Sequence, residues 1–294
     1  MIKLADETMF PALIWLWQQS FGDSVEYIHM FLKRNFNKIK TLVYMIADTP
    51  VSATYLLPAE YVSGCRRGGI KSLQSATGEY VNEMMNTNQK CLYLYAAATM
   101  PEYRGCGYFA QILSFIKENV KEPVLLVPAE EKLIAYYEKH GFVMEQEEFT
   151  LHIRRGPCKK GKIHDISAKR YFELREQALR YRTHIRWSEH FIKYICEENQ
   201  FLGGRQVCIS WCGERCIVLY RIENERLTVL EILSIKQKGI GKKTSERFVF
   251  EKVIQFLLQE TGYKYAKVCI KPRMMMYKNL AENEAKPYFN LTLG

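Results

Sequence analysis

Apolar residues along this 294-residue chain recur either in short runs or at helical spacing. Short runs and alternating positions predict strands over 2–4, 42–47, 51–57, 92–98, 124–127 and 149–153, with another near Phe142. Spacings of three and four predict helices over 7–19, 108–116 and 130–140, and one that follows Ser24, a capping residue type. Residues 59–90 show neither pattern and are expected to form an irregular excursion.

The second half of the chain repeats this order of elements. Strands are expected over 163–166, 207–211, 217–220, 227–233, 265–270 and 288–293, and helices over 167–179, 188–197 and 245–260. This repetition indicates two copies of one α/β fold with a mixed sheet. The basic stretch 154–162 contains Gly and Pro and lacks apolar periodicity. It is therefore predicted to link domains at 1–154 and 155–294.

Charge is divided unevenly between these halves. Residues 1–154 hold 15 basic and 17 acidic side chains, a net charge of −2, whereas residues 155–294 hold 27 and 15, a net charge of +12. A basic half attracts polyanions, but a solvated basic surface is the favoured interpretation. The run 180–187 interleaves basic and aromatic residues, which suits nucleic acid. We interpret it as a solvated helix end, so nucleic acid is not an expected partner.

The remaining composition predicts a cytoplasmic protein without a membrane partner. No apolar run is long enough to span a bilayer, and the first seven residues lack the apolar core of a signal peptide. Nine scattered cysteines make a poor disulfide framework and fit a reducing compartment. Cys208, Cys212 and Cys216 share a four-residue spacing, but a zinc site needs turn-borne pairs and a fourth ligand. No metal is expected.

The segment 95–110 carries the clearest chemical signal. An apolar strand runs through Ala98, Thr99 and Met100 into a loop, Arg104-Gly105-Cys106-Gly107, that opens directly into a helix beginning with Tyr108 and Phe109. The first amides of a helix lack intrahelical acceptors and lie at its positive end. Such a junction suits a phosphate or pyrophosphate, and a glycine at 107 lets the backbone approach it closely.

This loop resembles the acetyl-CoA-binding motif of the GCN5-related N-acetyltransferase (GNAT) superfamily, [Arg/Gln]-x-x-Gly-x-[Gly/Ala]. A second element, residues 128–142, resembles that family's helix with a Tyr-Glu-Lys-x-Gly-Phe ending. The resemblance covers residues 1–154 well and the second half in outline. It implies two GNAT-like domains in tandem and acetyl-CoA as cosubstrate. It also implies that the pantetheine arm lies where the fourth strand splays from the fifth, beside Ala98–Met100, with residues 104–109 cradling the pyrophosphate.

The same resemblance implies that an amine attacks the thioester directly and that Tyr137 is the general acid. Its neutral phenol can protonate the leaving thiolate, although Tyr137 also suits a core position. Phe109 departs from the family pattern, which has Gly or Ala there; it either crowds the cofactor or, as we favour, turns into the core. The fourth strand carries no carboxylate, and Asp23, Glu26, Glu79 and Glu83 are candidate bases among which the sequence does not choose.

In the second half, Lys236-x-x-Gly239-x-Gly241 imitates the loop motif, but no second Tyr-Glu-Lys-x-Gly-Phe element follows. We interpret this half as a degenerate copy that helps to build the acceptor pocket. The resemblance favours an N-acetyltransferase acting on a small-molecule or peptide amine. A non-catalytic acyl-CoA-binding or regulatory module is the alternative, and nucleic-acid binding through the basic half is a third.

Overall fold

The computed structural model describes residues 1–64, 88–235, 245–276 and 286–291. Strands up to residue 154 are β1 (Ile2–Leu4), β2 (Lys40–Ile46), β3 (Thr49–Val62), β4 (Asn88–Thr99), β5 (Val124–Leu126), β6 (Val143–Gln146) and β7 (Phe149–Arg154). Helices there are α1 (Phe10–Phe21), α2 (Val25–Asn35), α3 (Tyr108–Asn119) and α4 (Lys132–Lys139). Single 3-10 turns lie at Glu7–Met9, Phe36–Lys38 and Pro101–Tyr103.

The second half has a similar succession of elements. Its strands are β8 (Lys162–Asp165), β9 (His184–Arg186), β10 (Arg205–Trp211), β11 (Glu214–Glu223), β12 (Arg226–Ser234), β13 (Tyr265–Lys271) and β14 (Met274–Met276). Its helices are α5 (Ala168–Leu179), α6 (Glu189–Phe201) and α7 (Glu246–Thr261). Ser24, predicted as a helix cap, accepts the backbone N–H three residues further on, and Ser167, Ser188 and Ser245 do the same.

The strands form two mixed sheets whose connections follow the same plan. The first has the order β1-β2-β3-β4-β5-β14-β6, with β9 paired to β3, and the second has the order β7-β13-β12-β11-β10-β8. Each contains one parallel pair, β4 with β5 and β12 with β13. The α/β fold with mixed sheets is therefore confirmed. That the second half is a degenerate copy stays a prediction.

The two halves exchange strands across the predicted linker. β7 precedes residue 155 but pairs with β13 in the second sheet, whereas β14 from the second half lies between β5 and β6 in the first. Residues 155–161 form neither helix nor strand, as expected of a linker. A domain boundary at 154/155 stays a prediction, but the division of strands between the sheets does not follow it.

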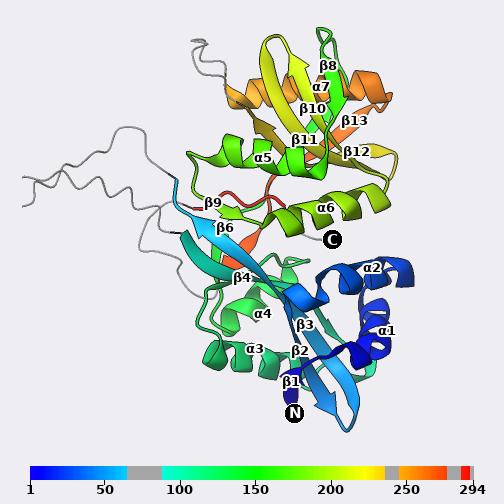
Figure 1. Ribbon diagram of the computed structural model, residues 1–294, viewed down its shortest axis with the longest axis vertical. Helices are drawn as coiled ribbons and strands as arrows, with labels where there is room; N and C mark the ends of the chain where they lie inside the picture. Colours follow the sequence, from blue (N-terminus) through cyan, green and yellow to red (C-terminus); the bar gives the residue numbers. More distant parts are fainter. Residues whose placement is uncertain (65–87, 236–244, 277–285, 292–294) are drawn as a thin grey trace, which may run out of the picture.

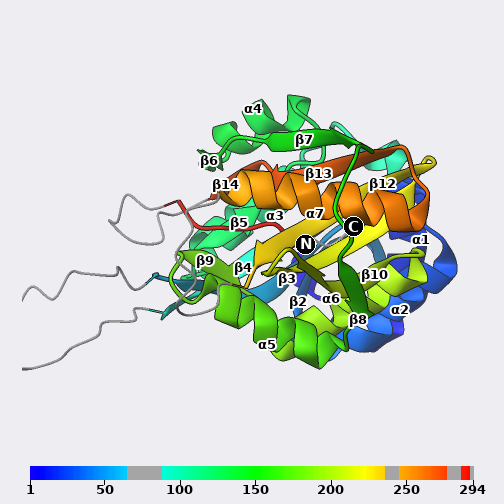
Figure 2. The same cartoon turned by 90° about the horizontal axis from the view of Figure 1, so that it is seen from above.

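Helices cover both faces of each sheet. Figure 1 shows the sheets one above the other along the long axis, with α6 between them. The largest core cluster joins α1, α2, α5 and α6 to the facing sides of both sheets. The outer sides pack separately, against α3 and α4 in the first sheet and against α7 in the second. Figure 2 shows α7 and α5 on opposite faces of the second sheet.

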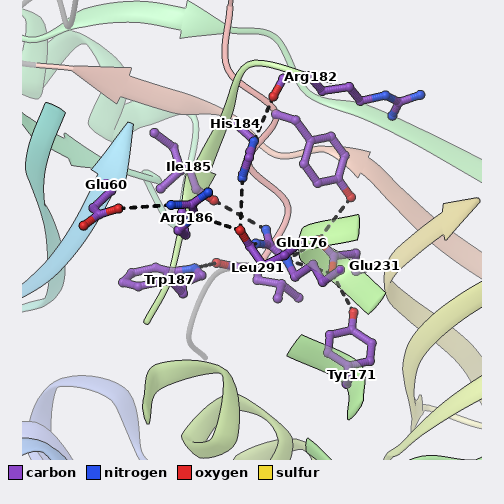
Figure 3. A network of polar contacts seen from close by, with 12 residues as sticks. Glu60, Tyr171, Glu176, Arg182, His184, Ile185, Arg186, Trp187, Glu231 and Leu291 are labelled. Carbon is purple, nitrogen blue, oxygen red and sulfur yellow. Dashed lines mark hydrogen bonds and ion pairs between the residues drawn. The ribbon is translucent and has the colours of Figure 1, made fainter. Parts of the chain in front are cut away.

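A buried polar network holds the second half together (Figure 3). The Arg175 guanidinium lies 3.2 Å from the Glu231 carboxylate, and both side chains are fully buried. The hydroxyls of Tyr171 and Tyr288 donate to the same carboxylate at 2.5 and 3.2 Å. This network anchors the C-terminal segment, since Tyr288 belongs to residues 286–291.

Several sequence predictions are wrong for segments whose structure depends on partners far away in the sequence. Residues 180–187 are not a solvated helix end: α5 ends at Leu179, and His184–Arg186 forms β9 against β3, with Ile185 and Trp187 buried. Strand β14 was not expected, and residues 288–291 form only an isolated bridge from Tyr288 to His184. The 59–90 excursion is shorter than expected, because β3 runs to Val62 and β4 begins at Asn88.

Candidate active site

Strands β4 and β5 part soon after they meet. They pair in parallel only at Leu92 with Val124 and at Tyr93 with Leu125, although β4 continues to Thr99. On its other side β4 stays paired with β3 as far as Ser52 and Thr99. The part of β4 beyond Tyr93 therefore presents an edge that β5 does not occupy. The predicted splay of these strands is present, and we call the opening the fork.

A β-bulge lies in the stretch of β4 that borders the fork. Tyr95 is opposite Tyr55 and Ala98 is opposite Ala53, so β4 carries one residue more than β3 between these pairs. Ala96 has a φ of 47°, in the left-handed region. The Thr54 hydroxyl donates to the Tyr95 carbonyl at 3.1 Å. A bulge re-aims backbone groups near functional sites, and nothing in the alanine run 96–98 predicted it.

The glycine loop follows directly after the end of β4. Gly105 and Gly107 have φ values of 79° and 77°, and a Cβ at either position would meet no other atom within 4 Å. The space beside both is therefore open to a ligand. Gly107 is the residue before α3 and supplies no capping side chain, so the first amides of the helix can bind an outside acceptor. Arg104 Nε donates to the Thr99 carbonyl at 3.1 Å and ties the loop to β4.

The other predicted loop residues fall on both sides of this junction. Cys106 is exposed, and Tyr108 stacks on Tyr44 with ring centroids 4.6 Å apart. Phe109 packs against the outer core cluster and stacks on Tyr136, with ring centroids 6.5 Å apart. The core placement favoured for Phe109 is confirmed.

Tyr137 is a buried residue of α4. It belongs to the outer core cluster, and its ring meets Phe142 edge-on with centroids 5.6 Å apart. Burial raises the pKa of Tyr137 well above its ordinary value, so the phenol keeps its proton at neutral pH. Tyr93 of β4 belongs to the largest core cluster, between the two sheets. Burial is the main cause of its raised pKa, and Tyr137 raises that pKa further. The two phenols belong to clusters on opposite sides of the first sheet.

Two of the four candidate bases, Asp23 and Glu26, belong to the described residues. Asp23 accepts a hydrogen bond from Trp17 Nε1 at 2.7 Å, and Glu26 is exposed on α2. Glu79 and Glu83 lie outside the described residues, as does the 236–241 motif. A buried carboxylate that the sequence did not single out, Glu198 of α6, accepts the Tyr27 hydroxyl at 2.5 Å. In the sequence, only the four-residue spacing from Tyr194 to Glu198 could have pointed to this carboxylate.

Within 1–64, 88–235, 245–276 and 286–291, no three His, Cys, Asp or Glu side chains are grouped to hold a metal ion. Cys208 and Cys216 are buried on β10 and β11, and Cys212 is exposed in the turn between these strands. None of the helices in this part of the chain is both long and apolar enough to span a membrane.

No protein-family model and no curated protein sequence matches the chain. Solved structures match it in fold. A conserved Enterococcus faecalis protein described as a probable N-acyltransferase has a TM-score of 0.65 and 12% identity, covering 94% of this chain and 72% of its own. A GCN5-related N-acetyltransferase from Kribbella flavida has a TM-score of 0.61 and 14% identity, covering 94% and 70%.

A putative acetyltransferase from Pyrococcus horikoshii matches over nearly all of both chains. Its TM-score is 0.58 at 10% identity, and the match covers 100% of this chain and 94% of that one. At such identities the likeness concerns the fold. The chain therefore has the fold of the GCN5-related N-acetyltransferases.

Proposed function

We propose that this protein is an N-acetyltransferase that moves an acetyl group from acetyl-CoA to an amine. The observation that carries the proposal is the fork between β4 and β5 with the glycine loop at its mouth. A fork exposes a strand edge to an extended amide-containing arm, and the loop beside it offers helix amides to a pyrophosphate. In this assignment Ala98, Thr99 and Met100 lie along the pantetheine arm, and residues 104–109 bind the pyrophosphate.

The chemistry follows from this placement. The amine lone pair attacks the thioester carbonyl beside the β4 bulge, where backbone N–H groups stabilise the developing oxyanion. Collapse of the tetrahedral species forms the amide and breaks the C–S bond. Tyr137 gives its proton to the leaving thiolate, a role supported by its buried neutral phenol. Acceptors are expected among small-molecule and peptide amines.

Release of CoA thiol, followed with a thiol reagent across a panel of amines, tests the proposal. Acetyl-CoA-dependent release that requires an amine, with the acetylated amine found by mass spectrometry, supports it. Acetyl-CoA binding without turnover on any amine supports instead a non-catalytic acyl-CoA-binding module. Absence of acetyl-CoA binding at millimolar concentration would rule out both.

Tyr137→Phe tests the assigned acid, with Tyr136→Phe as its neighbour control. Loss of a general acid lowers kcat by about 100-fold or more, while acetyl-CoA affinity stays the same. Tyr136 is half-buried on the same helix, and its ring stacks on the ring of Phe109. Tyr136→Phe should retain the wild-type kcat. An unchanged rate in Tyr137→Phe would remove Tyr137 from the mechanism.

A further inference from the structure

Three tyrosines and one glutamate meet where the two halves of the chain join. The hydroxyl of Tyr27, on α2, donates to Glu198 Oε1 at 2.5 Å and lies 3.2 Å from the hydroxyl of Tyr95, on β4. Tyr194, one turn before Glu198 on α6, donates to the same oxygen at 3.5 Å. Glu198 is 3% exposed. A continuous line of hydrogen bonds therefore leads from β4 to a carboxylate of the second half.

The β4 end of this line borders the fork. Tyr95 is two residues beyond Tyr93, the last β4 residue paired with β5, and it immediately precedes the bulged Ala96. In the proposed function the thioester carbonyl lies beside this bulge. Tyr95 is thus the member of the line that β4 carries, and Glu198 lies two hydrogen bonds behind its hydroxyl.

Exposed apolar side chains surround the solvent side of the same junction. The Phe201 ring lies 6.2 Å from the Tyr27 ring and is 49% exposed. Phe21, Val25 and Leu202, at the adjoining ends of α1, α2 and α6, are also exposed. This rim suits an amine attached to an apolar body. It guides the choice of 2-phenylethylamine as the probe.

The groups that face Glu198 are chiefly phenols. Burial, followed by the Glu198 charge, raises the pKa of Tyr27 and of Tyr194. Burial is also the main cause of the raised pKa of Tyr95, and Tyr27 and Glu198 raise that pKa further. Glu198 also contributes to the raised pKa of Tyr93 on β4, after burial and Tyr137. Glu197, the next residue on α6, is paired at the surface with Arg34 of α2. Phenols that are hydrogen-bonded in a line to a carboxyl group can pass a proton along these bonds.

Another buried carboxylate of the chain provides a contrast. Glu231 also accepts two tyrosine hydroxyls, but the Arg175 guanidinium lies against it, as in a structural ion pair. Glu231 belongs to the second sheet, whereas the Glu198 line ends on the strand that borders the fork. Only Glu198 of these two is therefore connected to the proposed reaction.

We infer that Glu198 receives, through the hydroxyls of Tyr27 and Tyr95, the proton that the acceptor amine loses. The inference rests on the proposed function. After the N–C bond forms, the nitrogen gives its proton to the Tyr95 oxygen, Tyr95 passes its own proton to Tyr27, and Tyr27 passes its own to Glu198. The thiolate takes its proton from Tyr137. Glu198 then loses its proton to water, and Tyr137 regains one from water, so all atoms balance.

Glu198→Gln tests this route, because it keeps the size of the side chain and removes its ability to take up a proton. With acetyl-CoA and 2-phenylethylamine, we expect kcat/KM to fall about 100-fold near pH 8 while the acetyl-CoA Kd stays within about twofold. The ratio of wild-type to variant kcat/KM should shrink toward one as the pH is lowered, because protonation removes the advantage of the wild-type carboxylate. The ratio also cancels the titration of the amine itself.

Glu197→Gln is the matched control, since it removes the neighbouring carboxylate from the same helix, and it should keep the wild-type rate and pH profile. Tyr27→Phe breaks the line but retains Glu198, so it should reproduce the Glu198→Gln profile and decides the matter if Glu198→Gln does not fold. Wild-type rate and pH profile in either folded variant would overturn the inference while the proposed function stands. If the wild type acetylates no amine of the panel, the proposed function and the inference fall together.

Discussion

The buried ion pair between Arg175 and Glu231 allows a quantitative stability prediction. Arg175→Met keeps most of the side-chain volume but leaves the Glu231 carboxyl fully buried beside two phenols without its cationic partner. Removing one partner of a buried pair costs about 3–5 kcal/mol, because the remaining charge loses its compensation. With a urea m-value of about 3 kcal/mol/M, the unfolding midpoint should fall by about 1–1.7 M.

Urea unfolding followed by tryptophan fluorescence measures this effect, since Trp187 is buried next to the network. The double variant Arg175→Met, Glu231→Gln should be less destabilised than the sum of the single variants, by about 2 kcal/mol or more. Arg205→Met breaks the exposed pair with Asp165 and should cost less than about 1 kcal/mol. A loss below about 1 kcal/mol in Arg175→Met would refute the reasoning.

Three further predictions concern the candidate active site. Gly107→Ala places a Cβ at a φ of 77° beside the loop and should weaken acetyl-CoA binding about tenfold or more by calorimetry. Gly213→Ala, at a φ of 84° in a distant hairpin turn, carries the same backbone cost and should leave the affinity unchanged; equal effects would contradict a ligand role for Gly107. Desulfo-CoA should protect exposed Cys106 from N-ethylmaleimide while exposed Cys212 reacts as before, and unprotected Cys106 would argue against the assigned cradle. Because burial raises the pKa of Tyr137, the phenol keeps its proton as the pH rises, and kcat should not fall between about pH 7 and 9. A fall in kcat that is present in wild type and absent in Tyr137→Phe would contradict this prediction.

Local patterns predicted most of the fold because they report local causes. The capping serines at 24 and 167 and the apolar face of α3 each depend on residues a few positions apart. Strands β9 and β14 depend on partners far away in the sequence: β9 pairs with β3, and β14 is inserted between β5 and β6. Periodicity within three residues cannot indicate such a partner.

The candidate site divides in the same way. The glycine loop is a contiguous motif, so its residues could be named from the sequence, and the open space beside Gly105 and Gly107 agrees with that prediction. The bulge at Ala96 appears only in the register of β4 against β3. Tyr27 and Glu198 are separated by 171 positions, and only the packing of α2 against α6 brings them together.

Isothermal titration of acetyl-CoA into the full chain tests the central claim most directly. The account predicts one binding site per chain, weakened about tenfold or more by Gly107→Ala and unaffected by Gly213→Ala. Absence of binding at millimolar acetyl-CoA, or an affinity that Gly107→Ala leaves intact, would contradict the assignment of the fork and its glycine loop as the acetyl-CoA site.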